Sequence, residues 1–569
     1  MGAPSGFFAV VGGVQEGQNL EGLLGEEAFE GWHAGAGGRN AAFRPRWQYN
    51  AGMTRWWLAL VFTLALAWAQ FRESGLPELA AQLDIATEPL LPVRVYLFKD
   101  QQPFRLSPVQ ALLPLNVDLF YRERLWRRAP SPDTLEVTCN EQSHFFLLNG
   151  RASFDLPAGR YRVEAYRGLF YRPAVEEFEL RAGERRRLVL RPEVWSGSQP
   201  WISGDDHIHL VRAPEDNDVF LKWLEAEDLS VGNFLQLQRQ MDAAAQYAFG
   251  PAGEARRPGR SIRSGQESRS EFYGHINLLG ARELIRPLSI NTIYANSAAA
   301  YPFPAVLFAR GRALGGTVGF AHFHGSQPHS TLLMDLALGN IDFTEVFQFG
   351  RLWTQEWYEL LNAGFRVTGI AGSDFPVPLN RVKPWPRWLP LLGPERTLVK
   401  GRPRESAYET WAEGVRKGEV VVSNGPLVEL TVDRAASTAT AAASFFRPLE
   451  KLEIVRNGQV IAAVPGDGSH AALSAVVRFD ASESCWLAAR TTARRLEGEP
   501  EIQAHTNPAY VLTEGRPVLV RTARETLATR WESELNYFRS ANLPFATEAQ
   551  RREFFTQAER ALEILRNPR

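Results

Sequence analysis

The stretch Gly204-Asp205-Asp206-His207-Ile208-His209 places two imidazoles one residue apart at the end of an apolar segment. Side chains alternate along a strand, so His207 and His209 are expected on the same side of an extended chain. Two neutral imidazoles at that separation can share one transition-metal ion. A pair of polar strand-end residues is the alternative for this motif alone. Six of the ten histidines lie between His207 and His329, so further candidate ligands follow downstream.

Composition argues against nucleic acid as a partner. The 569 residues are 45% hydrophobic and 22% charged, which is typical of a globular chain long enough for several domains. The formal net charge is -1 and no long basic run occurs, so there is no electrostatic case for nucleic-acid binding. We therefore expect the chain to act on a small-molecule substrate.

A targeting signal is predicted to begin at Met53. The short positive region Thr54-Arg55 precedes the mainly apolar run Trp56 to Leu66, and Ala67-Trp68-Ala69 follows as a small-x-small cleavage pattern. This is the layout of a secretory signal peptide. The run is shorter than the span of about 20 residues that crosses a bilayer, so no stable membrane span is expected. Residues 53–69 thus predict export to the periplasm or the medium of a bacterial cell, with a buried core helix as the alternative.

The segment before Met53 carries no structural pattern. Residues 1–52 are Gly-rich and aperiodic, so we expect translation to begin at Met53 and this stretch to be a non-native or disordered leader. Export would allow Cys139 and Cys485 to form a disulfide, since oxidising compartments permit one. These cysteines fall in regions that we assign to different domains, which does not favour the pairing.

Four regions follow the signal peptide. Residues 90–197 contain short alternating runs between Gly and Pro turns, which predicts an N-terminal β-sandwich-like domain. Residues 200–433 alternate strand-like and helical runs, which predicts an α/β unit with a mainly parallel sheet or barrel. Residues 434–520 return to short strands and predict a C-terminal β domain. Residues 522–569 form a helical tail whose apolar face we expect to dock on the enzyme body.

Periodicity also predicts individual elements of the α/β unit. Helices are expected over Val219–Asp228, Ala305–Leu314 and Trp353–Asn362, and strands over Thr317–His322, Phe343–Phe347 and Val367–Ser373. Residues 251–270 are polar and Arg-rich, and we predict a long loop near the site. Residues 382–394 are Pro-rich with two Trp, and either a flap over a cleft or a rigid surface loop would fit.

Four groups of metal-ligand residue types follow the strand-like runs of this unit. They are His207 with His209, Glu267 with His275, His322 with His324, and Asp374. The ends of successive strands converge on one pocket at the C-terminal face of such a sheet, so we expect these side chains to meet. Imidazole and carboxylate ligands together favour Zn, Mn or Fe over Ca or Mg.

Six motifs occur in a characteristic order: "GDDHIH", "GQESRSEFYGHINLLG", "GGTVGFAH", "DFTEV", "NAGFRVTGIAGSD" and "SNGPLVELTVD". In this order the chain resembles the carbaryl-hydrolase-like (CehA/McbA) metallohydrolases, a branch of the polymerase and histidinol phosphatase (PHP) superfamily. The resemblance covers about residues 200–435 and, more loosely, 504–511. It implies a distorted seven-stranded PHP-type β/α barrel, flanked here by small β-sandwich domains and the helical tail, whose clustered metals activate water.

The resemblance also implies a role for each matching residue. His207 and His209 would bind one metal, Glu267 would bridge two, His275 would bind the second, and His322 and Asp374 would complete the set. Many PHP proteins carry Thr-Asp-His and a terminal Asp-x-His where this chain has Ser230-Val-Gly-Asn233 and Asp374-Phe375-Pro376. These departures remove ligands of a third metal, so the resemblance implies two divalent ions at most.

Three further residues are candidates for work on the substrate. His324 lies two residues beyond His322 on the predicted strand and could protonate a leaving group, or hydrogen-bond a loop. Arg396 could hold a substrate carboxylate or phosphate, with a surface salt bridge as the alternative. Asn424, in Asn-Gly-Pro, could bind substrate or form a turn. Asp374 could accept a proton as well as bind metal.

These observations predict an exported, metal-dependent hydrolase that uses two metals and water to cleave an ester, carbamate or amide. A phosphoesterase is the alternative among hydrolases. A non-catalytic carbohydrate- or surface-binding protein that keeps the barrel is the alternative outside them. Bound metal is the property that separates the hydrolases from the binding protein.

Overall fold

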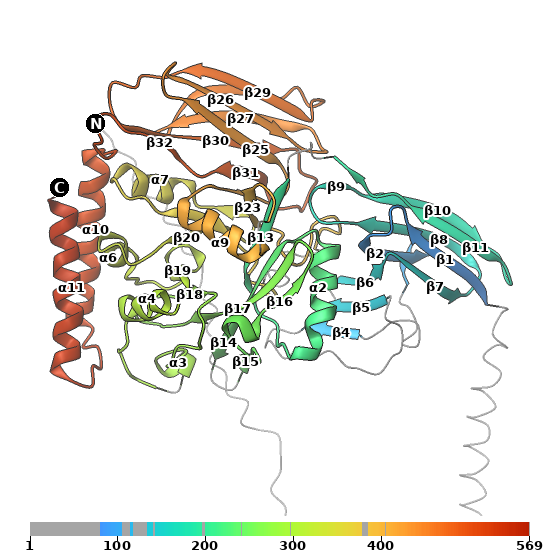
Figure 1. The fold of residues 1–569 in the computed structure, drawn as a ribbon, viewed down its shortest axis with the longest axis horizontal. Helices are drawn as coiled ribbons and strands as arrows, with labels where there is room; N and C mark the ends of the chain where they lie inside the picture. Colours follow the sequence, from blue (N-terminus) through green and yellow to red (C-terminus); the bar gives the residue numbers. More distant parts are fainter. Residues whose placement is uncertain are drawn as a thin grey trace, which may run out of the picture. The chain divides into compact units, whose positions relative to one another are not determined.

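The computed structural model describes residues 80–104, 114–117, 134–139, 143–195, 200–239, 242–295, 297–377, 385–403 and 406–567. The predicted leader and signal peptide, residues 1–69, lie outside these ranges. The described strands and helices belong to the unit Pro77–Arg569, which is mixed α and β with strands predominating (Figure 1). Within the described ranges, no helix has the length and apolar character to cross a membrane.

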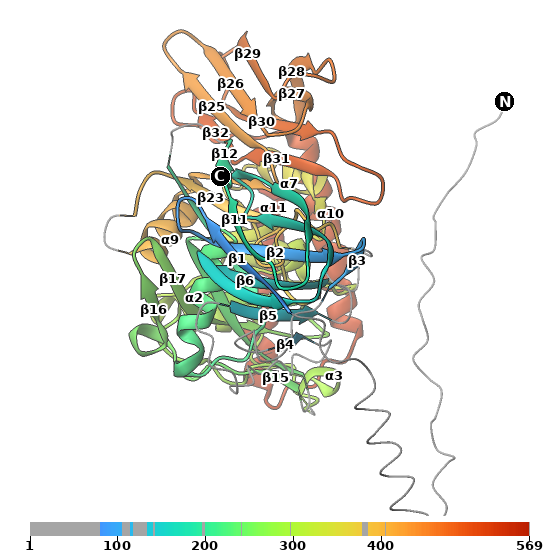
Figure 2. The same cartoon turned by 90° about the vertical axis from the view of Figure 1, so that its right-hand side faces the viewer.

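Two sheets form the N-terminal region (Figure 2). The first has the order β11 (Arg185–Leu190), β1 (Ala81–Thr87), β7 (Arg151–Leu156). The second has the order β10 (Ala174–Leu180), β8 (Gly159–Tyr166), β2 (Pro92–Lys99), β6 (Ser143–Asn149), β5 (Thr134–Cys139), β4 (Pro114–Val117), and β3 (Gln102–Pro103) pairs with β2. The short strands β9 (Tyr171–Arg172) and β12 (Glu193–Val194) pair separately. Alternate apolar residues such as Leu83, Val95 and Phe154 from both sheets share one core, as in a sandwich.

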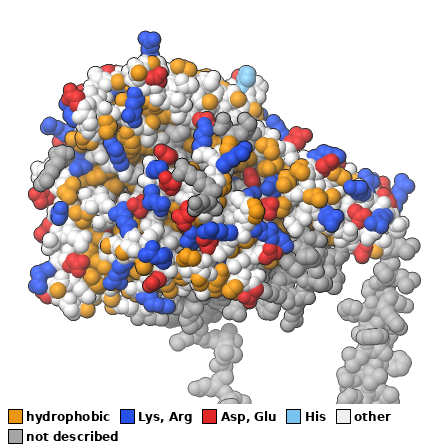
Figure 3. Space-filling model, in the orientation of Figure 1, with side chains coloured by type: hydrophobic (Ala, Val, Ile, Leu, Met, Phe, Trp, Pro, Cys, Tyr) orange, Lys and Arg blue, Asp and Glu red, His pale blue; other side chains and the backbone are white. Residues whose placement is uncertain are grey.

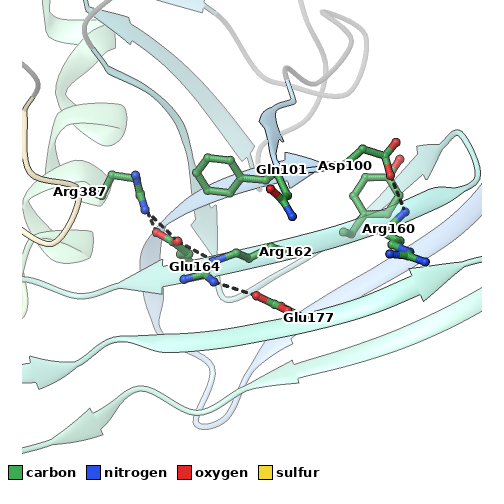
Figure 4. Close-up of a pocket in the computed structure, with 9 residues that line it drawn as sticks. Asp100, Gln101, Arg160, Arg162, Glu164, Glu177 and Arg387 are labelled. Atoms are coloured by element: carbon green, nitrogen blue, oxygen red, sulfur yellow. Dashed lines mark hydrogen bonds and ion pairs between the residues drawn. The ribbon is translucent and has the colours of Figure 1, made fainter.

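An ion-paired groove lies where this region meets Arg387 (Figure 4). The Glu164 carboxylate on β8 pairs with Arg162 at 2.8 Å and with Arg387 at 2.7 Å, and Arg162 also pairs with Glu177 at 2.8 Å. The charges of these four side chains are therefore matched within the protein. We assign them to holding the Arg387 segment against the sheet.

The sheet that carries the clustered histidines is mixed and curled. β13 (Trp201–Ile208) pairs in parallel with β14 (Val231–Arg239) and antiparallel with β23 (Arg396–Lys400). From β14 the order continues through β17 (Arg260–Ser268), β18 (Ile276–Leu279), β19 (Thr317–Phe320), β20 (Phe343–Gln348) and β22 (Thr368–Ala371). The pairs β17–β18 and β18–β19 are antiparallel and the others in this series are parallel. The predicted mainly parallel sheet is therefore only partly present.

The predicted distorted seven-stranded β/α barrel is not confirmed, because the described strands form no closed barrel. Between β22 and β23 the described residues form no ladder; Ala371 N instead donates to Thr397 Oγ1 at 2.8 Å, and that hydroxyl donates to Ala371 O at 3.0 Å. An isolated bridge between Ile208 and Phe375 links the end of β13 to the segment after β22. β22 ends at Ala371, and Asp374, three residues later, has φ 51°.

Helices follow several of these strands. α2 (Asn217–Ala226), α4 (Pro304–Ala313) and α7 (Thr354–Asn362) match the three predicted helices closely, and α9 (Ala407–Lys417) packs against β13 and β23. The smaller elements are η1 (Pro214–Asp216), η2 (Gly250–Gly253), α3 (Thr292–Ala295), α5 (His322–Gly325), α6 (Leu332–Ala337), β15 (Asp242–Ala244), β16 (Ala255–Arg257) and β21 (Arg351–Leu352).

The prediction of a loop over 251–270 is wrong, because β16 and β17 occupy most of it. β17 is buried although most of its residues are polar. Its polar groups find internal partners: Ser264 Oγ donates to Ala248 O at 2.6 Å and Gln266 Nε2 donates to Ile285 O at 3.1 Å. In the other predicted stretch, residues 385–394 form neither helix nor strand, and Trp385 and Trp388 within them are buried.

The sheet continues beyond residue 433. β24 (Val420–Ser423) pairs with β23 and with β31 (Ile502–Thr506), and the ladder extends to β30 (Cys485–Ala493), β27 (Leu449–Arg456), β28 (Gln459–Pro465) and β32 (Ala509–Val511). A separate three-stranded sheet consists of β25 (Leu427–Asp433), β26 (Thr438–Ser444) and β29 (Ala472–Arg478). Cys485 is a buried free thiol, and the side chain of Cys139 lies outside the described set.

The tail forms two helices, α10 (Arg521–Ser540) and α11 (Glu548–Arg566), which pack on each other and on α6 and α7 (Figure 1). The predicted apolar face of α10, with Leu527, Trp531 and Leu535, is buried in the same core as Phe303 and Tyr273. Docking of the tail on the body is thereby confirmed. On the face in Figure 3, basic and acidic side chains are interspersed rather than gathered by sign.

Candidate metal centre

The six predicted ligands lie at one end of the curled sheet. His207 lies near the end of β13, Glu267 near the end of β17, and His322 just beyond β19. His275 immediately precedes β18, whose start meets the end of β17 because the two strands are antiparallel. Asp374 follows β22. Strand direction therefore explains why residues more than 160 positions apart converge.

One group of atoms, the first half-site, consists of His207 Nε2, His209 Nε2, Asp374 Oδ1 and Glu267 Oε2. The two imidazole nitrogens are 3.0 Å apart. Asp374 Oδ1 lies 3.4 Å from His207 Nε2 and 3.3 Å from His209 Nε2. Glu267 Oε2 lies 3.7 Å and 3.1 Å from the same nitrogens. His207, His209 and Glu267 are fully buried, so these donors converge away from bulk solvent.

The second half-site consists of Glu267 Oε1, His275 Nδ1 and His322 Nε2. Glu267 Oε1 lies 3.0 Å from His275 Nδ1 and 3.5 Å from His322 Nε2. His275 and His322 retain 6% and 7% exposure, so this half-site lies nearer to solvent than the first. The two oxygens of Glu267 thus face different imidazole pairs, which is the arrangement of a bridging carboxylate.

The donors present fit divalent metal ions. Three overlapping groups, each with ligand atoms within 4.8 Å of one another, are His207, His322 and Asp374; His207, His209 and Glu267; and Glu267, His275 and His322. Among the described residues, the buried atoms Glu267 Oε1, His275 Nδ1 and Asp374 Oδ1 have no hydrogen-bond partner. Buried polar atoms normally have partners, so their convergence points to a ligand. Imidazole with carboxylate is the donor set of transition metals.

Each imidazole uses its other nitrogen to fix its orientation. The contacts are His207 Nδ1 with Glu345 Oε1 at 2.7 Å, His209 Nδ1 with Leu235 O at 3.1 Å, His322 Nδ1 with Gln348 Oε1 at 2.5 Å, and His275 Nε2 with Tyr294 Oη at 3.2 Å. Three of these partners are acceptors only at the contacting atom. They require N–H on that nitrogen, so in the neutral form that binds metal the opposite nitrogen directs its lone pair toward the cluster.

Electrostatics at the cluster favour positive charge. Burial alone would lower the pKa of His207, but the carboxylates of Glu345 and Asp374 raise it well above its ordinary value. Burial alone would raise the pKa of Asp374, but the imidazoles of His207 and its neighbours lower it to about 2. For Glu267, Arg269 and the imidazoles likewise outweigh burial and lower the pKa. These carboxylates are therefore ionised and stabilise a cation beside them, whether a proton or a metal ion.

Two of the ligands have backbone conformations that are uncommon for residues other than glycine. His322 has φ 52° and Asp374 has φ 51°, both in the left-handed region. Such conformations cost about 1–3 kcal/mol for residues other than glycine and persist where the surroundings hold them. Asp205 is one such restraint, because its carboxylate accepts from His207 N at 3.0 Å and Ser373 N at 2.9 Å. Two of the thirteen described non-glycine residues with a left-handed backbone are thus predicted ligands.

The structure does not bring the other predicted site residues into the cluster. His324 was expected on a strand face with His322, but β19 ends at Phe320 and the His324 ring lies 5.6 Å from that of Trp353. Arg396 is buried, and its described hydrogen bonds go to the carbonyls of Gly393, Glu227 and Asp228.

Asn424 pairs with backbone groups instead of facing the cluster. Its Nδ2 donates to Glu501 O at 2.7 Å, and its Oδ1 accepts from Gln503 N at 2.8 Å. These bonds match the turn role that was the alternative for the Asn-Gly-Pro motif.

Sequence reasoning missed several residues that contact the ligands. Glu345 on β20 bonds His207, Arg269 Nε donates to Glu267 Oε2 at 2.8 Å, and Asn277 Nδ2 donates to Glu345 Oε1 at 2.8 Å. Glu345 could have been found from the sequence. It is a carboxylate within a strand-like run, and the strand-like runs before and after it in the chain are followed by predicted ligands. Arg269 is only two residues from its partner Glu267, but an arginine there is no specific signal of a site. Asn277 had no signal, because its partner Glu345 is 68 positions away in the chain.

Comparison of the chain with protein-family models, with curated proteins and with solved structures found no match in any of the three.

Proposed function

We propose that the chain is an exported, metal-dependent hydrolase that uses two divalent ions and water to cleave an ester, carbamate or amide bond. The observation that carries this proposal is the Glu267 carboxylate, which is fully buried and turns one oxygen to each of two imidazole pairs. Arg269 Nε donates to Oε2 of this buried carboxylate, whereas Oε1 has no hydrogen-bond partner among the described residues and is available to a metal ion. The motif order that resembles the carbaryl-hydrolase-like branch of the PHP superfamily supports the same assignment.

The two half-sites offer different numbers of donors. The first has four donor atoms, and the second has Glu267 Oε1 with two imidazoles. Catalytic sites of this kind commonly combine three protein ligands with an open position for water or substrate. We therefore propose Zn or Mn, with Fe as a further possibility, and place substrate access at the second half-site. Divalent ions held there would polarise the scissile group and lower the pKa of water toward neutrality.

The chain's own residues would orient the reactants and move the proton. Asp374 is ionised because the neighbouring imidazoles lower its pKa to about 2 against the effect of burial, which suits a metal ligand. Such a weak base would accept a proton only from water whose own pKa is lowered by the divalent ions. Gln348 and Tyr294 hold the rings of His322 and His275 by their outer nitrogens. These contacts keep both rings directed at Glu267 before substrate arrives.

A phosphoester is the second candidate substrate, and one observation favours it. The Arg269 guanidinium is largely buried beside Glu267, which adds a cation at the cluster. Arginine is well suited to phosphate oxygens. A substrate screen that includes phosphoesters therefore belongs in the test of function.

The test is a metal analysis combined with a hydrolysis screen. We expect purified protein to contain transition metal, and chelation followed by addition of Zn²⁺ or Mn²⁺ to abolish and restore cleavage of one class among aryl esters, carbamates, amides and phosphoesters. His207→Ala and Asp374→Ala should reduce turnover to background. His470→Ala is the matched control, because this histidine is exposed and pairs only with Asp467 among the described contacts.

Absence of bound metal, or retained turnover in both ligand variants, would refute the hydrolase proposal. Protein without metal that binds carbohydrate would favour the non-catalytic alternative. Export belongs to the same proposal: N-terminal sequencing of the secreted form should begin at Gln70, and a mature chain that keeps Met53–Ala69 would contradict it.

A further inference from the structure

Glu345 contacts both half-sites without belonging to either. Its side chain is fully buried on β20, and its two oxygens point to different ligands. Oε1 lies 2.7 Å from His207 Nδ1, and Oε2 accepts from the backbone N of His322 at 2.6 Å. His207 belongs to the first half-site and His322 to the second. One carboxylate thus connects two ligands that are 115 positions apart in the chain.

At His207, Glu345 selects the form of the imidazole. A carboxylate oxygen at Nδ1 accepts a hydrogen bond from Nδ1–H, so in the neutral form that binds metal the lone pair lies on Nε2. Nε2 is the atom that faces His209, Asp374 and Glu267. Asn277 Nδ2 donates to the same carboxylate oxygen at 2.8 Å, which keeps Glu345 in place. The orientation of this ring therefore depends on a side chain that does not itself reach the ligand atoms.

At His322, Glu345 holds the main chain. His322 and Phe323 have φ 52° and 67°, so the backbone turns sharply just after β19. The bond from His322 N to Glu345 Oε2 restrains this turn, and Gln348, on the same strand, restrains the ring through Nδ1 at 2.5 Å. These contacts direct Nε2 toward Glu267 Oε1 at 3.5 Å. Strand β20 therefore positions the second half-site through two side chains.

We propose that Glu345 is a positioning residue that couples the two half-sites, so that metal affinity at each depends on the same carboxylate. This inference rests on the proposed two-metal function. A positioning role differs from the role of a metal ligand. Glu345 contacts the outer ring nitrogen of His207 and the backbone N of His322, and neither atom would bind metal. Partners of this kind typically contribute 10- to 100-fold, as an order of magnitude, to metal affinity.

Glu345→Gln tests the coupling because it keeps the size of the side chain and removes its charge. The readout is the dissociation constant for Zn²⁺, measured by competition with a chromophoric chelator. Two backgrounds measure the half-sites separately. His275→Ala protein lacks a donor of the second half-site and therefore reports on the first. His209→Ala protein lacks a donor of the first half-site and therefore reports on the second. We expect Glu345→Gln to weaken Zn²⁺ binding by about 10- to 100-fold in both backgrounds. Circular dichroism checks that the fold is retained.

Glu395→Gln is the matched control. Glu395 is also a buried carboxylate, but its described hydrogen bond goes to Gly350 N and not to a histidine. Its substitution should leave both dissociation constants unchanged. If Glu345→Gln does not fold, Asn277→Ala replaces it as the test. This variant keeps the carboxylate and removes the amide that donates to Glu345 Oε1 and that also lies 3.2 Å from His207 Nδ1.

Several outcomes overturn the coupling. They are wild-type affinity in both backgrounds, weakening in only one background, equal weakening by Glu395→Gln, or unchanged Zn²⁺ binding in Asn277→Ala where that variant is needed. Wild-type protein that binds no Zn²⁺ would instead refute the proposed function itself. The two failures are therefore distinguishable in one set of titrations.

Discussion

At the scale of single residues, Glu267 and Asp335 show how burial gives carboxylates different roles. Glu267 is surrounded by imidazoles and Arg269, so its charge is matched and it can connect two half-sites. Asp335 on α6 is equally buried, but its neighbours among the described residues include an amide from Asn340 and no cation within ion-pair distance. The first residue therefore favours the charged form and the second the neutral form.

Glu267→Gln should reduce bound metal more than the loss of either flanking imidazole. The glutamine amide cannot supply two anionic oxygens, so both half-sites are weakened together. His209→Ala and His275→Ala each remove a donor from one half-site only. The measurement is metal content per chain after equilibration with Zn²⁺ and removal of loosely bound ions. Equal stoichiometry in Glu267→Gln and His275→Ala would argue against a shared carboxylate.

Asp335 should make stability fall as pH rises. Burial raises the pKa of Asp335 to about 7, well above its value in an unfolded chain, although the Asn340 amide acts in the opposite direction. Between pH 4 and 7 the folded state therefore holds a proton that the unfolded state has lost. The free energy of unfolding then decreases by up to about 1.4 kcal/mol for each pH unit in this window.

Asp335→Asn should remove this contribution, because asparagine has a similar shape and does not ionise. The measurement is urea unfolding of metal-free wild type and variant between pH 5 and 8. We expect the variant to gain stability relative to wild type as pH rises, with the difference levelling above pH 7. Identical pH dependence in the two proteins would contradict the assignment.

At the scale of elements, the C-terminal helices are bound to the metal-bearing unit by a continuous apolar stripe. α10 buries Trp531 and Leu535 against α11 and the core that contains Tyr273. Trp531 Nε1 also donates to Ala558 O at 2.8 Å, which links the two helices. Tyr273 lies two residues before His275, so the packing of the tail extends to a segment that carries a predicted ligand.

Trp531→Ala should lower the free energy of unfolding by about 3–5 kcal/mol, because it leaves a large cavity in a fully buried position. Ser533→Ala, at an exposed position of the same helix, should change it by no more than about 0.5 kcal/mol. Urea unfolding followed by circular dichroism measures both. A loss below about 1 kcal/mol for Trp531→Ala would mean that the tail contributes little to the fold.

At the scale of the whole molecule, a buried ion pair joins the N-terminal sandwich to the metal-bearing unit. Arg94 on β2 and Glu227 after α2 are fully buried, with Arg94 Nε 3.0 Å from Glu227 Oε1. Arg94 Nη1 also donates to Arg387 O at 2.6 Å. Regions that the sequence pattern assigns to separate domains are thus held together by charges that neither region could bury alone.

Arg94→Ala should destabilise the protein by about 3–5 kcal/mol, since it leaves the Glu227 charge buried without its partner. The double variant Arg94→Met with Glu227→Leu should lose less than the sum of its two single variants, as measured by urea unfolding. Arg191→Ala serves as control, because its pair with Glu88 is exposed and worth at most about 1 kcal/mol. Additive losses in the double variant would show that the pair is not coupled.

Much of the local structure could be predicted from periodicity, and its failures have a physical reason. The helices at α2, α4 and α7 and the apolar face of the tail follow from patterns of apolar residues along short segments. Strand β17 could not be predicted in this way. Most of its buried residues are polar, and they form hydrogen bonds with residues of other segments. The prediction of the barrel also failed. Whether a barrel closes depends on how β22 and β23 meet, and here they meet through the Thr397 side chain instead of a strand ladder.

The sequence by itself determined the chemistry that is available: imidazoles and carboxylates at the ends of strand-like runs, in numbers that suit transition metals. The tertiary structure decided how these groups are shared. It turned the two oxygens of Glu267 to different imidazole pairs, held His322 in a left-handed conformation, and placed Glu345 behind both half-sites. These features depend on the register and direction of strands that are far apart in the chain, and local residue patterns carry no information about such distances.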